Sequence, residues 1–224
     1  MIGKLYGVST GPGDPELMTV KSIKAIEKCG VIAVPRTKGE NALALSIVKN
    51  AVSIECKEIL MLDFPMTRDR DELCKAWRTA ADRIEEYLAK GDDIAMLCLG
   101  DISVYSTFSY TAELVKADGY ETVCIPGVTS FCAAAAEEGN PLVCGDSPLI
   151  VIPSGCTDRN RLIDEKGTKV IMKPGKKLDE IKTLLKGRNV SAAVNCGMES
   201  SAVYKNAEDI PSDSGYFTII TVRE

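Results

Sequence analysis

The sequence contains no histidine among its 224 residues. Histidine is the commonest metal ligand and the side chain that titrates near neutral pH. Its absence excludes a Ser-His-Asp hydrolase, a histidine-ligated metalloenzyme and a histidine-based chelatase. Basic residues are also outnumbered, with 27 Lys and Arg against 32 Asp and Glu and a net charge of −5. Nucleic-acid-binding proteins usually carry a basic face, so we expect no nucleic-acid partner, and a basic pocket would have to be local.

Long apolar runs and paired cysteines are missing as well. The longest apolar stretches, such as residues 94–99, are far shorter than the roughly 20 residues that span a bilayer. The amino terminus lacks the basic, apolar and small-residue series of a secretion signal. The nine cysteines are scattered singly with no C-x-x-C pair, a pattern typical of neither a disulfide framework nor a zinc knuckle. We therefore predict a cytoplasmic protein without a membrane partner or protein-bound metal, whose cysteines are mainly small apolar core residues.

Strand-like and helix-like patterns alternate along the first half of the chain. Strands are expected at 2–8, 31–34, 94–98 and 122–125, and helices at 16–28, 41–49, 70–90 and 107–116. Alternation of this kind indicates parallel βαβ units. Beyond residue 120, expected strands at 149–153, 170–172, 192–195 and 217–222 are separated by only one or two clear helices. We predict an α/β fold with an open, mainly parallel sheet in residues 1–119, a mixed sheet in residues 120–224, and a ligand cleft between them.

Three glycine-centred turns follow predicted strands: Gly-Pro-Gly-Asp at 11–14, Leu-Gly-Asp at 99–101 and Pro-Gly-Val-Thr-Ser at 126–130. A single turn of this kind is most often an ordinary strand-to-helix connection. Three of them should meet at the carboxyl edge of the sheet, where open α/β folds bind ligands. The first turn is not a Walker loop, because Gly-Lys-Ser/Thr is missing, and it is not a dinucleotide-binding Gly-x-Gly-x-x-Gly, because Glu16 takes the third position. A Rossmann dehydrogenase would also need an acidic residue where Pro35 and Arg36 stand.

These segments closely resemble the tetrapyrrole methyltransferases that build cobalamin and sirohaem. The resemblance includes GPGDPELMT at 11–19, LGDISVYST at 99–107 and PGVTSF at 126–131, in the same order and spacing. Phe-Pro-Met-Thr at 64–67, ahead of a helix that carries Trp77, is similar to the branch that methylates precorrin-2 at C(20). The sirohaem branch has an acidic residue, assigned to proton transfer, where this chain has Pro35-Arg36, which speaks against uroporphyrinogen as the substrate.

The resemblance implies a two-domain class III S-adenosylmethionine-dependent methyltransferase fold, usually a homodimer, with S-adenosylmethionine held between the domains. The positions that match the family's cofactor contacts are Pro12, Gly100, Asp101, Val104, Thr129, Ser130, Met172 and Gly197. We add their neighbours Ser103, Tyr105 and Ser106. For Met172, a plain core position is an equal alternative.

Methyl transfer from a sulfonium to carbon needs no metal and no histidine. The methyl group is already activated, the reduced tetrapyrrole supplies an electron-rich carbon, and positioning alone can contribute roughly 7–11 kcal/mol. A proton must then leave C(20). Asp63, Asp101 and Tyr105 are open candidates for its acceptor, and Asp101 is expected rather to meet the cofactor.

The acetate and propionate groups of such a substrate require local cations. Arg36 with Lys38, and Arg68 with Arg70, lie on predicted loops after strands, and arginine can grip a carboxylate with two hydrogen bonds. The predicted substrate contacts are Arg36, Met66, Thr67 and Arg68. A solvated surface charge is the alternative for each arginine, and helix capping is the alternative for Thr67.

We therefore predict C(20) methylation of precorrin-2 or its cobalt complex in cobalamin biosynthesis. One alternative is another methyltransferase of the superfamily, acting at a different corrin position or on sirohaem precursors, ribosomal RNA or protein. The Phe-Pro-Met-Thr segment points away from RNA and protein substrates. A second alternative is a non-catalytic tetrapyrrole carrier.

Overall fold

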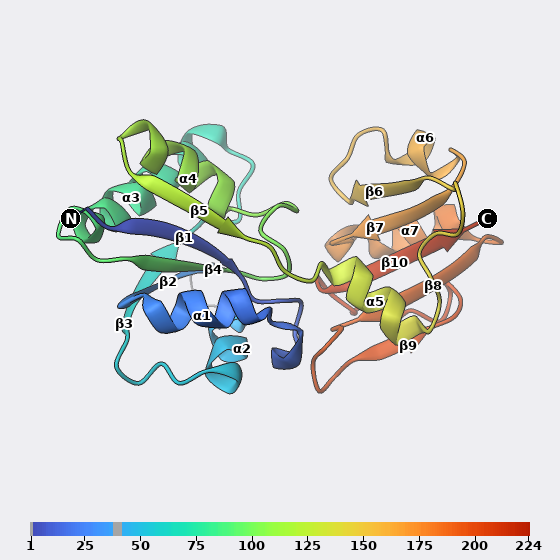
Figure 1. Ribbon diagram of the computed structural model, residues 1–224. Coiled ribbons are helices and arrows are strands. Elements are labelled where there is room, and N and C mark those ends of the chain that lie inside the picture. Colours follow the sequence, from blue (N-terminus) through green and yellow to red (C-terminus); the bar gives the residue numbers. More distant parts are fainter. Residues whose placement is uncertain (1, 38–41) are drawn as a thin grey trace. The chain divides into compact units, whose positions relative to one another are not determined.

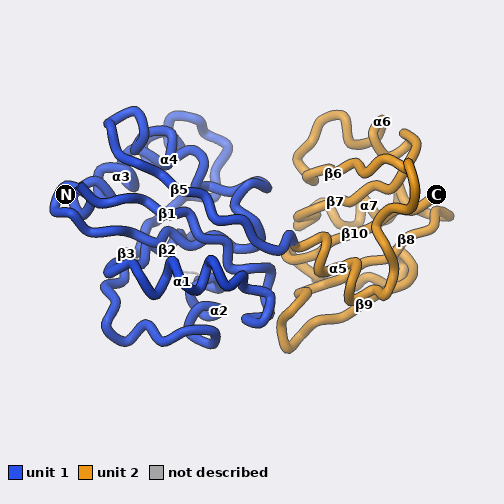
Figure 2. Tube along the Cα trace, viewed as in Figure 1, with its two compact units in different colours: residues 1–129 blue, residues 130–224 orange. Residues whose placement is uncertain are grey.

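The computed structural model describes residues 2–37 and 42–224. The chain forms two compact units, residues 1–129 and 130–224 (Figure 2). The sequence places the boundary near Gly119, whereas the structure keeps the next strand, β5 (Glu121–Ile125), in the first unit because it pairs with β1 (Lys4–Ser9).

A parallel sheet of five strands forms the centre of the first unit. Its order is β3-β2-β4-β1-β5. Besides β1 and β5, the strands are β2 (Val31–Arg36), β3 (Glu58–Asp63) and β4 (Ile94–Cys98). Helices α1 (Val20–Lys28) and α2 (Leu43–Ala51) pack on one face, and α3 (Arg70–Leu88) and α4 (Phe108–Ala117) pack on the other (Figure 1). Strand β3 has no counterpart among the predicted strands.

The helix expected at 16–28 is divided into two elements. A 3-10 turn, η1 (Pro15–Leu17), begins at Asp14, whose carboxylate accepts a hydrogen bond from the Glu16 N–H at 2.8 Å. The helix α1 then begins after Thr19, whose hydroxyl accepts from the Ser22 N–H at 3.1 Å. Each cap satisfies a backbone N–H donor that the start of a helix leaves unpaired. Because the segment has a second cap at Thr19, a new helix begins there and the first turn does not continue. The part of the predicted helix 41–49 that falls on Asn41 lies outside the described residues.

Helix α3 lies within the helix predicted at 70–90 and has an apolar face whose residues recur every three or four positions. Ala80, Ala81, Ile84 and Leu88 are buried in the core between the sheet and α3–α4. Trp77 is partly buried and stacks on Tyr110 of α4, with ring centroids 4.2 Å apart. The helix begins at Asp69, whose side chain accepts hydrogen bonds from the backbone N–H groups of the first turn.

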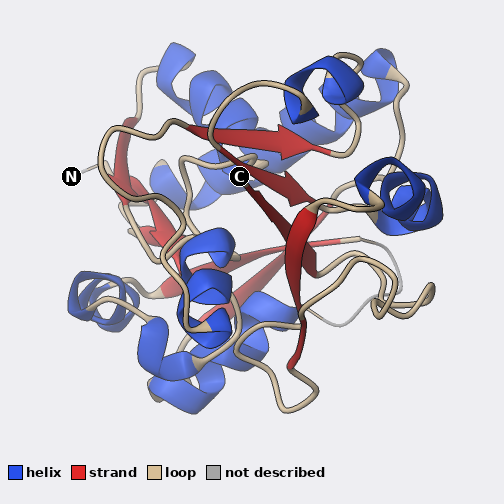
Figure 3. Ribbon diagram, turned by 90° about the vertical axis from the view of Figure 1, so that its right-hand side faces the viewer, coloured by secondary structure: helices blue, strands red, loops and turns tan. Residues whose placement is uncertain are grey.

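The second unit has a mixed sheet, as predicted, in the order β6-β7-β10-β8-β9. Strands β6 (Leu149–Pro153) and β7 (Thr168–Met172) are parallel, and the pairs formed by β8 (Asn189–Val194), β9 (Ala202–Tyr204) and β10 (Thr218–Arg223) are antiparallel. Helices α6 (Arg159–Ile163) and α7 (Leu178–Leu185), the latter preceded by the 3-10 turn η2 (Gly175–Lys177), supply residues to the core of this unit. Helix α5 (Ser130–Glu138) packs on β8 and β10, and Figure 3 shows helices flanking the strands.

The predicted role of the cysteines is wrong for most of them. Cys29, Cys98 and Cys196 are buried and Cys156 is intermediate, but five others are exposed: Cys56, Cys74, Cys124, Cys132 and Cys144. Cys74, Cys124 and Cys132 lie on exposed faces of α3, β5 and α5, and Cys56 and Cys144 lie in exposed turn or loop segments. Among the described residues, no helix is both long and apolar enough to cross a membrane.

Candidate functional site

The first two glycine turns are bonded to each other at the carboxyl ends of neighbouring strands. Gly11 follows β1 and Gly100 follows β4, and each donates its N–H to the carbonyl of the other, at 3.2 and 2.8 Å. Their φ angles of +72° and +75° lie in the left-handed region that favours glycine. The prediction that these turns meet at one sheet edge is confirmed.

A buried serine joins these turns to the third one. The Ser9 hydroxyl donates to the Ile125 carbonyl at 2.8 Å and accepts from the Ile102 N–H at 2.9 Å. The Ser9 carbonyl also accepts from the Ser22 hydroxyl of α1 at 2.8 Å. One side chain therefore connects the ends of β1, β4 and β5. Ser9 is not among the predicted site residues, although a serine just ahead of a glycine turn, at the end of an apolar strand, is a signal in the sequence that could have indicated it.

Asp101 forms the second connection between turns. One carboxylate oxygen accepts the Gly127 N–H at 2.6 Å, and the other accepts the N–H of Ser103 at 2.9 Å and the Ser103 hydroxyl. Burial favours a raised pKa for Asp101, but the hydrogen bonds from Gly127 and Ser103 outweigh it and hold the pKa below the ordinary carboxyl value. Asp101 is thus an ionised acceptor whose two oxygens are both engaged, and this makes it a poor candidate for the proton acceptor.

Close packing requires glycine at position 127. A Cβ built on Gly127 would lie 2.4 Å from the Ser9 Cβ, far inside van der Waals contact. Gly100 is different, because a Cβ built there meets no atom within 4 Å. The buried Gly100 therefore has unfilled space beside its Cα, while the third turn is packed against the first strand.

The loop after Asp101 contains the remaining predicted cofactor contacts of the second turn. Val104 donates its N–H to the Asp101 carbonyl at 3.2 Å. Tyr105 is half-exposed and has a left-handed φ of +49°. The Ser106 hydroxyl lies 3.2 Å from the Cys98 sulfur and accepts the Phe108 N–H at 3.2 Å. Burial raises the pKa of Cys98 to about 12, which makes this thiol an inert neighbour.

The other predicted cofactor residues are distributed along both units. Pro12 is buried in the first turn, and Thr129 and Ser130 are half-buried after the third. In the second unit, Met172 is buried at the end of β7, and its carbonyl accepts the Ser154 N–H at 3.0 Å. The Gly197 N–H, on the turn after β8, donates to a Glu137 carboxylate oxygen at 2.7 Å. The buried position of Met172 agrees with either of its two predicted roles.

The predicted substrate residues lie at the carboxyl ends of β2 and β3. The guanidinium of Arg36 pairs with Asp63, its neighbour in register on β3, at 2.7 Å. Arg68 and Met66 are exposed on the following loop, and Thr67 accepts the Asp69 N–H at 3.1 Å rather than capping α3 itself. Lys38 lies outside the described residues. Arg36 is therefore one half of an ion pair, not an isolated surface cation.

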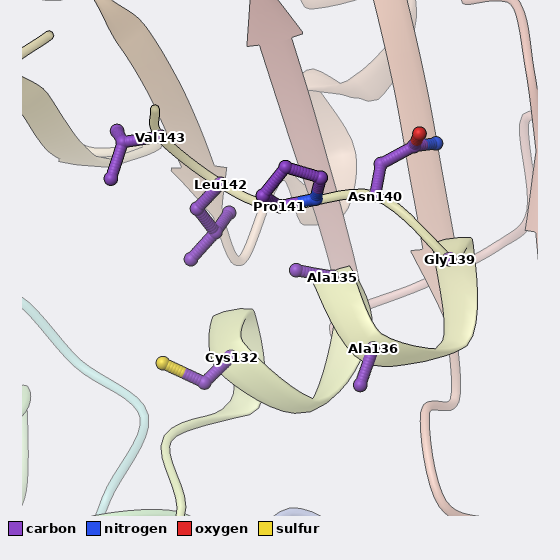
Figure 4. Close-up of a pocket in the computed structure, with 8 residues that line it drawn as sticks. All are labelled: Cys132, Ala135, Ala136, Gly139, Asn140, Pro141, Leu142 and Val143. Carbon is purple, nitrogen blue, oxygen red and sulfur yellow. The ribbon is translucent and has the colours of Figure 1, made fainter. Parts of the chain in front are cut away.

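Two further observations concern other kinds of site. In the described part of the chain, no three His, Cys, Asp or Glu side chains are grouped so that they could hold a metal ion. A hollow of about 480 Å³ lies between α5 and the segment that follows it, lined mostly by apolar residues that include Cys132 and Leu142 (Figure 4). None of the predicted site residues lines this hollow.

The fold and the turns define a two-unit α/β protein in which loops at the carboxyl edge of a parallel sheet are fixed for ligand binding. The model of the tetrapyrrole (corrin/porphyrin) methylases matches residues 4–210. A probable cobalt-precorrin-2 C(20)-methyltransferase of Methanocaldococcus jannaschii is 38% identical over 190 residues, which are 84% of this chain and 80% of the relative. A precorrin-2 C(20)-methyltransferase of Sinorhizobium is 32% identical over 99% of this chain and 95% of its own length.

Solved structures agree with this assignment of the fold. The uroporphyrin-III C-methyltransferase of Thermus thermophilus complexed with S-adenyl homocysteine superposes with a TM-score of 0.70, at 18% identity, over 99% of this chain and 98% of its own. The chain belongs to the tetrapyrrole methylase family. This confirms the resemblance and the α/β fold predicted from the sequence.

Proposed function

We propose that the protein is an S-adenosylmethionine-dependent methyltransferase that methylates the C(20) bridge carbon of cobalt-precorrin-2 or precorrin-2 in cobalamin biosynthesis. The observation that carries the proposal is the set of three turns held at one sheet edge, in a chain that matches C(20)-methyltransferases over most of its length. We propose further that it acts as a homodimer in the cytoplasm, as the family resemblance implies.

The residues of the first unit fit the methyl donor. The space beside Gly100 has room for a ligand atom, and the hydrogen bonds of Ser9 and Asp101 fix the surrounding backbone before the ligand arrives. S-adenosylmethionine supplies an activated methyl group. The predicted contacts of the second unit, Met172 and Gly197, would complete its binding.

Positioning is the main contribution that this chain can make to the reaction. A fixed loop holds the reacting groups in line, and effective molarity from such orientation accounts for roughly 7–11 kcal/mol of barrier. The loss of the C(20) proton then requires an acceptor. Asp101 accepts three hydrogen bonds, and the two other predicted candidates are Asp63, which pairs with Arg36, and Tyr105.

The experiment is an anaerobic incubation with S-adenosylmethionine and either metal-free precorrin-2 or its cobalt complex, followed by mass spectrometry of the pigment. We expect the gain of one methyl group at C(20) and one equivalent of S-adenosylhomocysteine. Methylation of only the cobalt form would identify that form as the substrate. Methylation of neither form, with S-adenosylhomocysteine still bound, would contradict the C(20) proposal, and tight binding of pigment without turnover would favour a carrier.

A further inference from the structure

An exposed aromatic pair lies at the sheet edge of the second unit that contains Met172. Tyr216 and Phe217 immediately precede β10 and are 44% and 40% exposed. Their rings meet edge to face, with centroids 5.4 Å apart. Contiguous exposed apolar side chains, unlike ones scattered singly, are typical of binding surfaces. None of the predicted site residues belongs to this pair.

One backbone hydrogen bond and the pairing of β10 place the aromatic pair between the ends of β7 and β8. The Phe217 carbonyl accepts the N–H of Asn195, which directly follows β8, at 2.9 Å. Ile219, two residues farther along, is in register with Met172 of β7. The two residues that follow β7 and β8, Lys173 and Asn195, have left-handed φ angles of +57° and +52°. Backbone strain of this kind occurs preferentially at ligand sites.

One lysine ammonium lies beside the aromatic pair, and two more lysines follow it in the same segment. The Lys173 ammonium lies 5.3 Å from the centroid of the Tyr216 ring, and the segment after β7 reads Lys-Pro-Gly-Lys-Lys at 173–177. Among the described residues, the ammonium groups of Lys173, Lys176 and Lys177 form no ion pair. Of the two acids at the start of α7, Glu180 pairs with Arg159, and Asp179 accepts a hydrogen bond from the Ser212 hydroxyl at 2.7 Å. Residues 173–177 thus include three lysines and no acidic residue, on a chain with a net charge of −5.

We propose that Tyr216, Phe217 and the lysines at 173, 176 and 177 form a binding platform for the tetrapyrrole substrate. This proposal rests on the proposed methyltransferase function and assigns residues to the binding of its substrate. Flat conjugated rings stack on aromatic side chains, and ammonium groups attract the acetate and propionate groups at the rim of the macrocycle. The methyl donor fits less well, because its sulfonium and ammonium outweigh its one carboxylate and three lysines repel that net positive charge.

The binding test uses uroporphyrin III as a stable tetrapyrrole polycarboxylate, with its affinity read from fluorescence, and S-adenosylhomocysteine, with its affinity read by calorimetry. The variants are the double replacement Tyr216→Leu with Phe217→Leu, and the single replacement Lys173→Met. We expect the double variant to bind the porphyrin about tenfold more weakly. Lys173→Met should weaken binding a few-fold at low salt, with the difference lost at high salt, because ions screen an exposed charge. Affinity for S-adenosylhomocysteine should not change.

Matched controls separate the platform from general surface effects. Tyr110→Leu removes a tyrosine of similar exposure, 49%, from α4 in the first unit. Lys205→Met removes an exposed lysine from the turn after β9. Both should bind the porphyrin as the wild type does. Circular dichroism and the thermal midpoint establish that each variant is folded.

Two results would overturn the platform. One is unchanged porphyrin affinity in both platform variants, and the other is a loss confined to S-adenosylhomocysteine, which would assign the aromatic pair to the cofactor. In the methylation assay, the platform variants should raise KM for the tetrapyrrole with little change in kcat. A different result would contradict the proposed methyltransferase function and leave the platform standing: the wild type would bind porphyrin through the platform but methylate neither form of precorrin-2.

Discussion

At the scale of single residues, two side chains determine how the three turns meet. Ser9 and Asp101 are both buried, and each bonds to backbone of a loop that lies far away in the sequence. The Ser9 hydroxyl and the Ile125 carbonyl, for example, come from residues 116 positions apart. Backbone groups fixed in this way need no reordering when a ligand binds, which lowers the entropic cost of binding.

Ser9→Ala should lower both the free energy of unfolding and the affinity for the cofactor. The loss of affinity should exceed that of a variant that is equally destabilised elsewhere in the same sheet. The change leaves the buried Ile102 N–H without its acceptor and the Ile125 carbonyl without its donor, at a cost of about 1–3 kcal/mol. We expect S-adenosylhomocysteine affinity to fall and amide exchange at Ile102 to accelerate. Calorimetry and hydrogen-exchange mass spectrometry measure both.

Ile94→Val is the control for Ser9→Ala. Ile94 is buried at the amino end of β4, in the same sheet as Ser9 but at the opposite edge from the glycine turns. The change costs about 0.5–1.5 kcal/mol of stability. It should lower stability without changing cofactor affinity. If both variants lose the same affinity, Ser9 acts only through stability.

Asp101 should make the folded state sensitive to acid. Its pKa is below the ordinary value of about 3.9 in the folded chain, so its contribution to stability is complete above that value and is lost as the pH falls through the folded pKa. Asp101→Asn should lower the free energy of unfolding at neutral pH and flatten its dependence on pH below about 4. Urea unfolding at a series of pH values tests this, and an unchanged acid limb would contradict it.

At the scale of elements, α5 is held to the second sheet by a buried ion pair. The Glu138 side chain is 1% exposed and pairs with Arg223 of β10 at 2.7 Å. The hydroxyl of Ser191, on β8, donates to the same carboxylate at 2.6 Å. This helix carries Ser130 at its start, so its attachment also places a predicted cofactor residue.

Glu138→Ala should therefore destabilise the second unit strongly. The change removes a buried carboxylate and leaves the partly buried Arg223 guanidinium without its charge partner; loss of one partner of a fully buried pair costs about 3–5 kcal/mol, which is the upper bound here. Glu165→Ala breaks the exposed pair with Arg161 in the same unit and should cost less than about 1 kcal/mol. Urea unfolding compares the two variants. Similar losses in both would show that the Glu138 pair is not a stabilising contact.

Comparison of the strands with the sequence shows which of them local residue patterns predict. Strands β4 and β6 have the bounds that the sequence predicts, because each is a short, continuous apolar run. Strand β3 was missed, and so was β9, which is only three residues long and is paired to β8. Short strands are stabilised by their neighbours more than by their own propensity, so the sequence pattern is a weak guide to them.

At the scale of the whole molecule, the two units have separate cores. Ile84 is buried between the first sheet and α3–α4, and Leu185 is buried beneath α7 in the second unit. Because each sheet buries its own apolar faces, each unit can lose stability by itself.

Ile84→Ala and Leu185→Ala should each act on one unit. Both side chains are 0% exposed, and a cavity of this kind costs about 2–5 kcal/mol. Hydrogen-exchange mass spectrometry should show faster exchange in residues 1–129 for the first variant and in residues 130–224 for the second. Equal acceleration in both units for either variant would mean that the chain unfolds as one cooperative body.

By itself, the sequence determined the α/β alternation, the three turns, the absence of histidine chemistry and the family resemblance. These features are written in residues close together along the chain, where strand, helix and turn preferences act. The tertiary structure alone decided that Ser9 joins three turns, that Asp101 is occupied, that Arg36 faces Asp63 and that Tyr216 and Phe217 stand beside Lys173. Such contacts depend on strand order and register, because a sheet brings together residues that the sequence separates and a shift of one position turns each side chain to the other face.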